Sequence, residues 1–284
     1  MTPPLALSIL DQSPIISGHT ARDAIAATVA LAVAAERLGY RRYWLAEHHG
    51  LLGLADPCPE ILLTRIAAAT STLRVGTGGI MLPYYSAFKI AEVFRMLEAL
   101  FPGRIDLGVG RAPGGDMQTA NAMSGGRYRG APEFAEQVQD VIGYLSGVLP
   151  DEHPFRSVIV QPAQTGMPEF WMLGSSDYGA ALAAALGLRF TFAHFITADG
   201  GDVVTRAYRQ RFQPSPALRS PYAMVAAFVL CAETDVEAER LAACIDLRRL
   251  QMDAGLNGPI PTLAEVDATR LTDADRMRIR NHRR

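Results

Sequence analysis

Short runs of β-branched and aromatic residues alternate with longer Ala- and Leu-rich stretches along most of the chain. The short runs have the length and composition of buried strands, and the longer stretches space their apolar residues as helices do. The pattern predicts seven strand-then-helix units in succession. The predicted strands are LALSILDQSPI, YRRYWLAEHH, LRVGTGGIML, RIDLGVGRA, EFWMLG, RFTFAHFI and YAMVAAFVLCAE.

This regular alternation of strand and helix requires parallel strands joined by right-handed crossovers. An open doubly wound sheet and a closed (β/α)₈ barrel both satisfy it. The first turn, DQSPIISGHT, lacks the G-x-G-x-x-G pattern of a dinucleotide-binding sheet, and the units follow one another without a long break. We therefore predict an α/β barrel in a single domain over residues 1–284. After Met252 no eighth strand is evident, so the barrel is expected to lack its eighth β-α unit.

The composition narrows the class of function. The chain is 49% hydrophobic and 20% charged, and its net charge of -2 gives no general attraction to nucleic acid or anionic membranes. The longest apolar run, AIAATVALAVAA, is shorter than the roughly 20 residues that span a bilayer. The N-terminus has no basic segment of the signal-peptide type, and the three scattered cysteines suit a reducing cytoplasm. Lys89 is the only lysine, which disfavours a Schiff-base aldolase.

The second predicted strand ends in three ionisable residues, Glu47, His48 and His49. Neighbouring strand residues point to opposite faces, so the two histidines cannot readily share a metal ion, and the chain has no H-E-x-x-H motif. We therefore expect no metal site. Two interpretations remain. Both histidines are hydrogen-bonded at a strand end, or one neutral histidine at the barrel mouth acts as a donor or proton relay.

Ser175 and Ser176 follow the fifth predicted strand, where the next helix begins. Free backbone N–H groups, the helix dipole and two hydroxyls together form a potential anion site. The same residues are also common helix caps, and the carboxylate of Asp177 would repel a phosphate. Both interpretations remain open.

Glycines mark two further strands. In GRIDLGVGRAPGGD bulky residues alternate with glycines, which leaves one face bare for a flat ligand or a close backbone approach. Arg111 ends this strand and suits a phosphate or carboxylate, although surface arginines are more common. Gly78 and Gly79 indicate either a ligand against the main chain or a tolerated kink. His194 ends another strand, where it lines the same mouth or packs in the core.

Five stretches, taken in order, resemble the bacterial luciferase-like flavin monooxygenases, and more closely the single-chain branch called luciferase-like class oxidoreductases. They are LDQSPI, YWLAEHH, VGTGGIMLP, GRIDLGVGRAPG and LGSSDY. The likeness runs from about Leu7 to about Cys244. It implies a (β/α)₈ barrel, which agrees with the prediction from the alternation of elements.

The resemblance also implies roles for individual residues. His48 is expected to face the flavin and take part in catalysis. Gly78 and Gly79 are expected to be joined by a cis peptide beneath the flavin ring, and Arg111 to reach the FMN phosphate. The remaining cofactor-binding residues implied in this way are Ser175 and Ser176 in a phosphate-binding turn and, more weakly, Asp116.

The implied reaction takes reduced FMN from a separate flavin reductase and uses dioxygen to oxygenate a small organic substrate. A homodimer packed through helices near the second and third strands is also implied. Tyr84, Tyr85, Met117 and His194 are candidates for the substrate pocket, and the loop 112–131 is expected to shape it, but no substrate is identified. Two alternatives stay open. One is a deazaflavin-dependent hydride transfer on the same barrel, and the other is a degenerate protein that binds flavin without catalysis.

Overall fold

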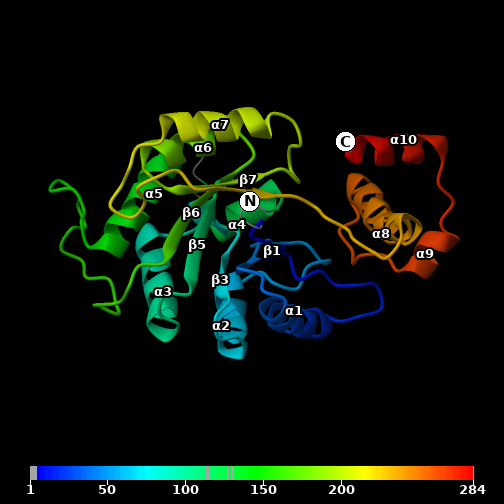
Figure 1. Cartoon of the computed structure of the whole chain (residues 1–284), viewed down its shortest axis with the longest axis horizontal. Coiled ribbons are helices and arrows are strands. Elements are labelled where there is room, and N and C mark those ends of the chain that lie inside the picture. Colours follow the sequence, from blue (N-terminus) through cyan, green and yellow to red (C-terminus); the bar gives the residue numbers. More distant parts are fainter. Residues whose placement is uncertain (1–4, 113–114, 127, 129–130, 284) are drawn as a thin grey trace.

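The strands form a parallel, nearly closed barrel surrounded by helices, as predicted (Figure 1). The structure, a computed structural model, describes residues 5–112, 115–126, 128 and 131–283. The strands are β1 (Ser8–Asp11), β2 (Arg42–Leu45), β3 (Arg74–Thr77), β4 (Ile80–Met81), β5 (Ile105–Gly110), β6 (Glu169–Gly174), β7 (Arg189–Ala193) and β8 (Ala223–Ala226). They pair in the order β1-β2-β3-β5-β6-β7-β8, and the short β4 pairs with β5.

The helices follow the strands in the predicted alternation. They are α1 (Ala21–Arg37), α2 (Pro59–Ala69), α3 (Ala87–Leu100), α4 (Met117–Met123), α5 (Ala131–Ser146), α6 (Asp177–Ala185), α7 (Gly201–Arg211), α8 (Asp235–Asp253), α9 (Leu263–Ala268) and α10 (Asp273–His282), with a 3₁₀ turn η1 (Leu82–Tyr84). Thr20 closes a capping box at the start of α1. None of the described helices combines the length and the apolar character needed to cross a membrane.

The predicted strands are longer than the observed ones, and two differ in kind. The third predicted strand is two strands, β3 and β4, separated by Gly78 and Gly79. The seventh ends at Ala226, and the apolar residues after it, Phe228 and Val229, are exposed. Helices α4, α9 and α10 are additions to the predicted pattern.

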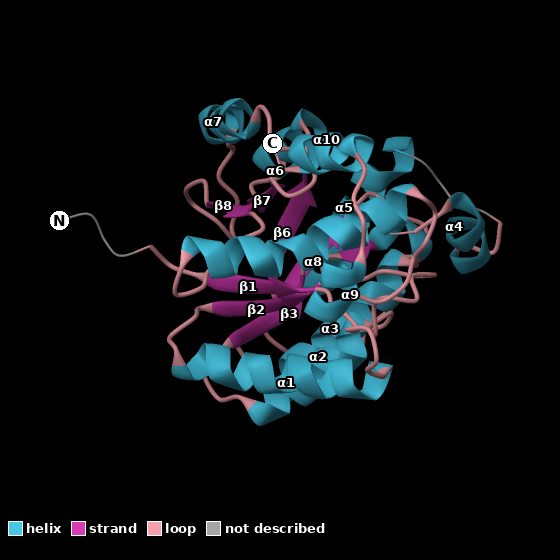
Figure 2. Cartoon of the chain, turned by 90° about the vertical axis from the view of Figure 1, so that its right-hand side faces the viewer, coloured by secondary structure: helices cyan, strands magenta, loops and turns pink. Residues whose placement is uncertain are grey.

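No strand among the described residues joins β8 to β1. The chain after β8 instead returns as α8 and α9, on the side of β1 and α1, and as α10, which packs on α8 (Figure 1). Turned by 90°, these helices lie in front of the strands (Figure 2). The Ile260 backbone fastens this group to the end of β1, because its N–H donates to Ile15 O at 2.8 Å and its carbonyl accepts from Ser17 N at 2.8 Å. The predicted absence of an eighth β-α unit therefore matches the observed topology.

The outer faces of the strands pack on the helices. Ile105, Leu107 and Val109 of β5 are fully buried in this layer, together with Tyr43 and Leu45 of β2. Their alternation with Asp106, Gly108 and Gly110 confirms the two-faced character predicted for this strand. Burial of each large side chain of this kind contributes about 1.5–3 kcal/mol.

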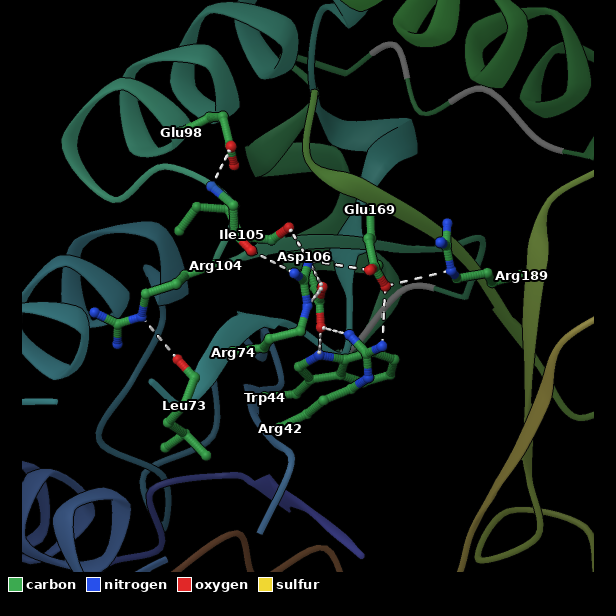
Figure 3. Close-up of polar contacts among 12 residues, drawn as sticks. Arg42, Trp44, Leu73, Arg74, Glu98, Arg104, Ile105, Asp106, Glu169 and Arg189 are labelled. Carbon is green, nitrogen blue, oxygen red and sulfur yellow. Dashed lines mark hydrogen bonds and ion pairs between the residues drawn. The ribbon is translucent and has the colours of Figure 1, made fainter. Parts of the chain in front are cut away.

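A charged cluster fills the opposite face where the strands begin (Figure 3). Asp106, which is fully buried, accepts from Arg42 Nη1 at 2.6 Å, from Arg74 Nη2 at 2.6 Å and from Trp44 Nε1 at 2.9 Å. Glu169 accepts from Arg42 Nη2 at 2.9 Å, and Arg189 Nε lies 3.3 Å from the same carboxylate oxygen. The carboxylates thus neutralise most of the charge of three arginines that would otherwise be costly to bury.

Two tryptophans lie between this cluster and the far ends of the strands. The rings of Trp44 and Trp171 meet edge-on with centroids 5.1 Å apart, and Arg42 stacks 4.8 Å from the centroid of Trp171. One strand step beyond, Ala46, Gly78 and Gly110 carry small side chains or none, while Leu173 follows Trp171 on β6. The barrel interior is therefore filled at the amino ends of its strands and becomes less crowded toward Gly110 at the carboxyl end of β5.

Candidate active site

Most of the sequence-predicted site residues follow the carboxyl ends of parallel strands. His48 follows β2, Gly78 and Gly79 separate β3 from β4, and Arg111 follows β5. Ser175 follows β6. Because neighbouring parallel strands end at the same rim, the topology brings these residues together on one edge of the barrel, where barrel enzymes place their active sites.

Gly78 and Gly79 are required by close packing. Their peptide bond is cis, as the resemblance implies. A Cβ on Gly78 would lie 2.5 Å from Leu10 Cδ1, and one on Gly79 would lie 2.7 Å from the carbonyl oxygen of Gly108. The interpretation of a merely tolerated kink is therefore wrong. Gly110 differs, because the only atom within reach of its Cβ is Ile80 O at 4.0 Å, so its bare face borders open space.

The two histidines after β2 have different surroundings. His49 Nε2 lies 2.6 Å from Glu47 Oε1. His48 is partly buried and its ring interacts with the backbone of Ala46, while its Nδ1 has no hydrogen bond of good geometry among the described residues. Burial lowers the pKa of His48 below its ordinary value, which keeps the imidazole neutral near pH 7. A partly buried neutral ring with an unpartnered nitrogen is suited to a proton relay. No cluster of His, Cys, Asp and Glu in the described ranges could hold a metal ion.

Arg111 and the turn after β6 come together. The Arg111 guanidinium carbon lies 4.5 Å from the ring centroid of Tyr178, which is in the first turn of α6. Ser176 occupies the N-cap position of α6, yet its side chain makes no capping hydrogen bond. The hydroxyl and the first N–H groups of this helix are thus left to a ligand, next to a positive charge. The arrangement favours an anion site over plain capping.

Asp116 and Met117 have other surroundings. Asp116 is an exposed residue that caps α4, where its Oδ1 accepts from Thr119 N at 2.7 Å. Met117 is 57% exposed. Their roles in flavin and substrate binding stay predictions. His194 is exposed at the end of β7, so the interpretation of a core histidine is wrong. Part of the loop 112–131 lies outside the described residues.

Tyr84 and Tyr85 form a wall beside the histidines. Tyr84 is buried, with its ring centroid 5.9 Å from that of His49 and 5.8 Å from that of Tyr128. Helix α4 joins this wall, because a Cβ on Gly115 would lie 2.7 Å from His49 O. The wall is therefore aromatic and mostly apolar, with Met81 and Ala120 in the same cluster.

Sequence reasoning missed two residues near the rim. Tyr178 has no sequence signal beyond its place two residues after Ser176. Asp56 is 5% exposed, and its Oδ2 has no hydrogen-bond partner in the part of the chain that the structure describes. Burial raises the pKa of Asp56 to about 6. Its position between Leu54 and the helix-starting Pro59 resembles an ordinary loop in the sequence, so burial could not be foreseen.

The bare rim, the unpartnered nitrogen of His48 and the anion site fit a cofactor that is flat at one end and phosphorylated at the other. Phosphorylated flavins have these properties. Residues 7–281 match the family model described as luciferase-like monooxygenase. The chain is 45% identical to the uncharacterized protein YceB of Bacillus subtilis, over 98% of this chain and 84% of that protein. It is 40% identical to the N-acetyl-S-alkylcysteine monooxygenase of the same organism, over 83% and 70% respectively.

Solved structures show the same similarity to this family. The crystal structure of apo-MsnO8 superposes with a TM-score of 0.87 at 39% identity, covering 93% of this chain and 78% of that one. More distant structures share the fold alone. One is the oxygenating constituent of 3,6-diketocamphane monooxygenase from Pseudomonas putida in complex with FMN, with a TM-score of 0.67 at 19% identity over 89% and 77% of the two chains.

Proposed function

Because the chain belongs to the luciferase-like monooxygenase family, we propose that it binds reduced FMN from a separate flavin reductase and oxygenates a small organic substrate with dioxygen. Membership of this family, together with the related monooxygenases of known structure, makes the chain a flavin-dependent oxygenating enzyme. The observation that carries the proposal is the pairing of Arg111 with the uncapped start of α6, on the same rim as His48.

In this proposal, one set of residues binds the phosphate of the cofactor and another set contacts its flavin ring. Arg111, Ser175 and Ser176 hold the phosphate through charge-assisted and neutral hydrogen bonds. The flavin ring lies near the main chain at Gly78 and Gly79, where the side chains of Leu10 and Leu173 come close. When bound, reduced FMN supplies the electrons that activate dioxygen, which is chemistry that protein side chains do not provide.

The side chains of the protein transfer protons and exclude water from the site. His48, neutral near pH 7, carries a proton on one ring nitrogen and offers a lone pair on the other, so it relays a proton to or from the reacting oxygen. Tyr84 and the start of α4 close the side of the site next to His49 and limit the entry of water. Dry surroundings suppress the wasteful release of hydrogen peroxide.

The substrate is proposed to be small and partly apolar, because Met81, Tyr84 and Tyr128 line one side of the site. The name of the N-acetyl-S-alkylcysteine monooxygenase suggests a first probe, N-acetyl-S-methylcysteine, whose thioether sulfur accepts one oxygen atom. The three cysteines are unpaired, which supports a reducing, cytoplasmic location.

A homodimer formed through α2 and α3 completes the proposal. A groove of about 490 Å³ lies on these two helices and is lined in part by Glu60, Lys89 and Met96. Ile61 and Met96 are more than half exposed beside it. Apolar side chains around a groove with both signs of charge suit a self-complementary interface. Light scattering after size-exclusion chromatography would measure the mass.

The function is tested by anaerobic titration with reduced FMN, followed by admission of dioxygen with and without N-acetyl-S-methylcysteine or related thioethers. We expect binding of reduced FMN and, with a true substrate, oxygen uptake without equivalent peroxide release. Binding of a reduced deazaflavin with hydride transfer and no oxygen uptake would instead establish the deazaflavin alternative. Binding of flavin without oxygen uptake or hydride transfer would support the degenerate protein, and failure to bind either cofactor would refute the proposed function.

A further inference from the structure

Glu47 is a buried carboxylate at the end of β2 whose two oxygens are both occupied. Oε1 accepts from His49 Nε2 at 2.6 Å and from the Tyr85 hydroxyl at 2.5 Å. Oε2 accepts from the N–H of Met81 at 2.8 Å. Glu47 is 1% exposed, and its one ion-pair partner in the described ranges is His49. Three hydrogen-bond donors, none of them from a lysine or arginine, stabilise this buried carboxylate. Each of these donors would lose its acceptor if the carboxylate were removed.

These three bonds join separate parts of the rim. His49 belongs to the segment after β2, whereas Met81 ends β4 and Tyr85 follows η1. Met81 in turn pairs with Gly110 of β5, the residue before Arg111. A second link runs in the same direction, because Gly78 N donates to Leu45 O at 2.7 Å. Glu47 thus connects the histidine segment to the segment on which the flavin ring is proposed to lie.

We propose that Glu47 is a positioning residue of the active site, whose carboxylate fixes His48 in front of Gly78 and Gly79 without touching the flavin. The inference rests on the proposed function for the role of His48. Glu47 and His48 are consecutive in the chain, so anchoring the side chain of Glu47 restricts the main-chain position of His48. Misplacement of a catalytic group by about 1 Å can lower turnover by about 100-fold.

The negative charge of Glu47 also acts on the pKa of His48. Burial lowers this pKa, whereas the charge of Glu47 raises it and so favours the protonated ring. Replacement of Glu47 by glutamine keeps the shape but removes this charge. It also turns an amide NH₂ toward one of the three donors, which then has no acceptor.

The experiment begins with histidine-labelled protein free of flavin, so that it does not depend on activity. In E47Q we expect the NMR titration midpoint of His48 to move to lower pH and the signal of His49 to shift. With reduced FMN we expect at least about tenfold lower coupled oxygenation, more peroxide release, and a flavin Kd within about threefold of the wild type, because Arg111 and the α6 turn are untouched. The matched control is E98Q, which alters another buried carboxylate, on α3, away from the rim. It should leave the His48 signal unchanged.

Y85F removes one of the three donors and keeps the charge. We expect it to reduce coupling by less than E47Q and to leave the His48 midpoint in place. If E47Q is unfolded by circular dichroism, Glu47→Asp and Y85F decide the question in the same assays. An unchanged His48 midpoint in E47Q, or unchanged coupling in the Glu47→Asp and Y85F variants, would overturn the inference. A wild-type protein that binds no reduced flavin would refute the proposed function, while the NMR titration would still report on Glu47.

Discussion

The guanidinium of Arg111 stacks on the ring of Tyr178, with 4.5 Å between its central carbon and the ring centroid. The two residues come from different strand-helix units, and the stack holds a mobile side chain at the start of α6. A planar guanidinium held in this way is pre-organised for two hydrogen bonds to a phosphate. A lysine cannot stack equally or bind in the same forked manner.

Replacement of Arg111 by lysine is therefore expected to weaken FMN binding by about tenfold, which corresponds to about 1.4 kcal/mol. Tyr178→Leu should weaken it less, because the arginine remains but is less well ordered. Fluorescence titration with FMN and with riboflavin measures both. Riboflavin has no phosphate, so its affinity should be nearly the same in all three proteins. An equal loss for riboflavin would place Arg111 away from the phosphate. Arg206→Lys, on the exposed face of α7, serves as the control.

His48→Ala should keep the fold and lower coupled oxygenation by about 100-fold, the usual contribution of a positioned proton relay. The flavin should still bind, since Arg111 and α6 are unchanged. Oxygen uptake, product formation and hydrogen peroxide are measured in the same reaction. Unchanged coupling would remove His48 from the mechanism.

Asp106→Asn should destabilise the protein by about 3 kcal/mol. The fully buried carboxylate accepts from Arg42 and Arg74, and its removal leaves buried positive charge uncompensated. Urea unfolding followed by circular dichroism measures the change. The exposed pair of Asp202 with Arg206 provides the comparison, and Asp202→Asn should change stability by less than about 1 kcal/mol. Equal effects of the two substitutions would contradict a structural role for the cluster.

Asp56 should make stability depend on pH. Burial raises its folded-state pKa from 3.8 to about 6, so the folded protein holds this proton more tightly than the unfolded chain does. Its contribution is fully present below about pH 4 and is lost as the pH rises through about 6. Asp56→Asn has no such proton. The free energy of unfolding of this variant, relative to the wild type, should therefore increase by about 2 kcal/mol from pH 4 to pH 7. Parallel pH curves for the two proteins would show that Asp56 is not the responsible group.

Local sequence patterns were sufficient for the barrel and for much of its rim. Strand β6 has the predicted bounds, Glu169–Gly174, because an apolar run is followed there by a glycine and two serines. The alternation of bulky residues and glycines in β5 also followed from residue type alone, whereas at Gly78 and Gly79 the sequence left a tolerated kink open.

Contacts between distant residues could not be predicted in this way. Glu47 reaches Met81 and Tyr85 across 34 and 38 residues, and Asp106 reaches Trp44 across 62. A sequence does not distinguish a buried carboxylate from a solvated one, because the donors that stabilise a buried carboxylate come from distant parts of the chain. The break between β3 and β4 and the seven-residue α4 were missed for a related reason. Both depend on packing against the strand end after β2 rather than on periodicity.

At the amino ends of the strands, Arg42, Trp44 and Trp171 fill the inside of the barrel and are almost completely buried. A ligand that reaches the interior is therefore expected to enter from the opposite rim, so the flavin and the substrate of the proposed reaction would share one entrance.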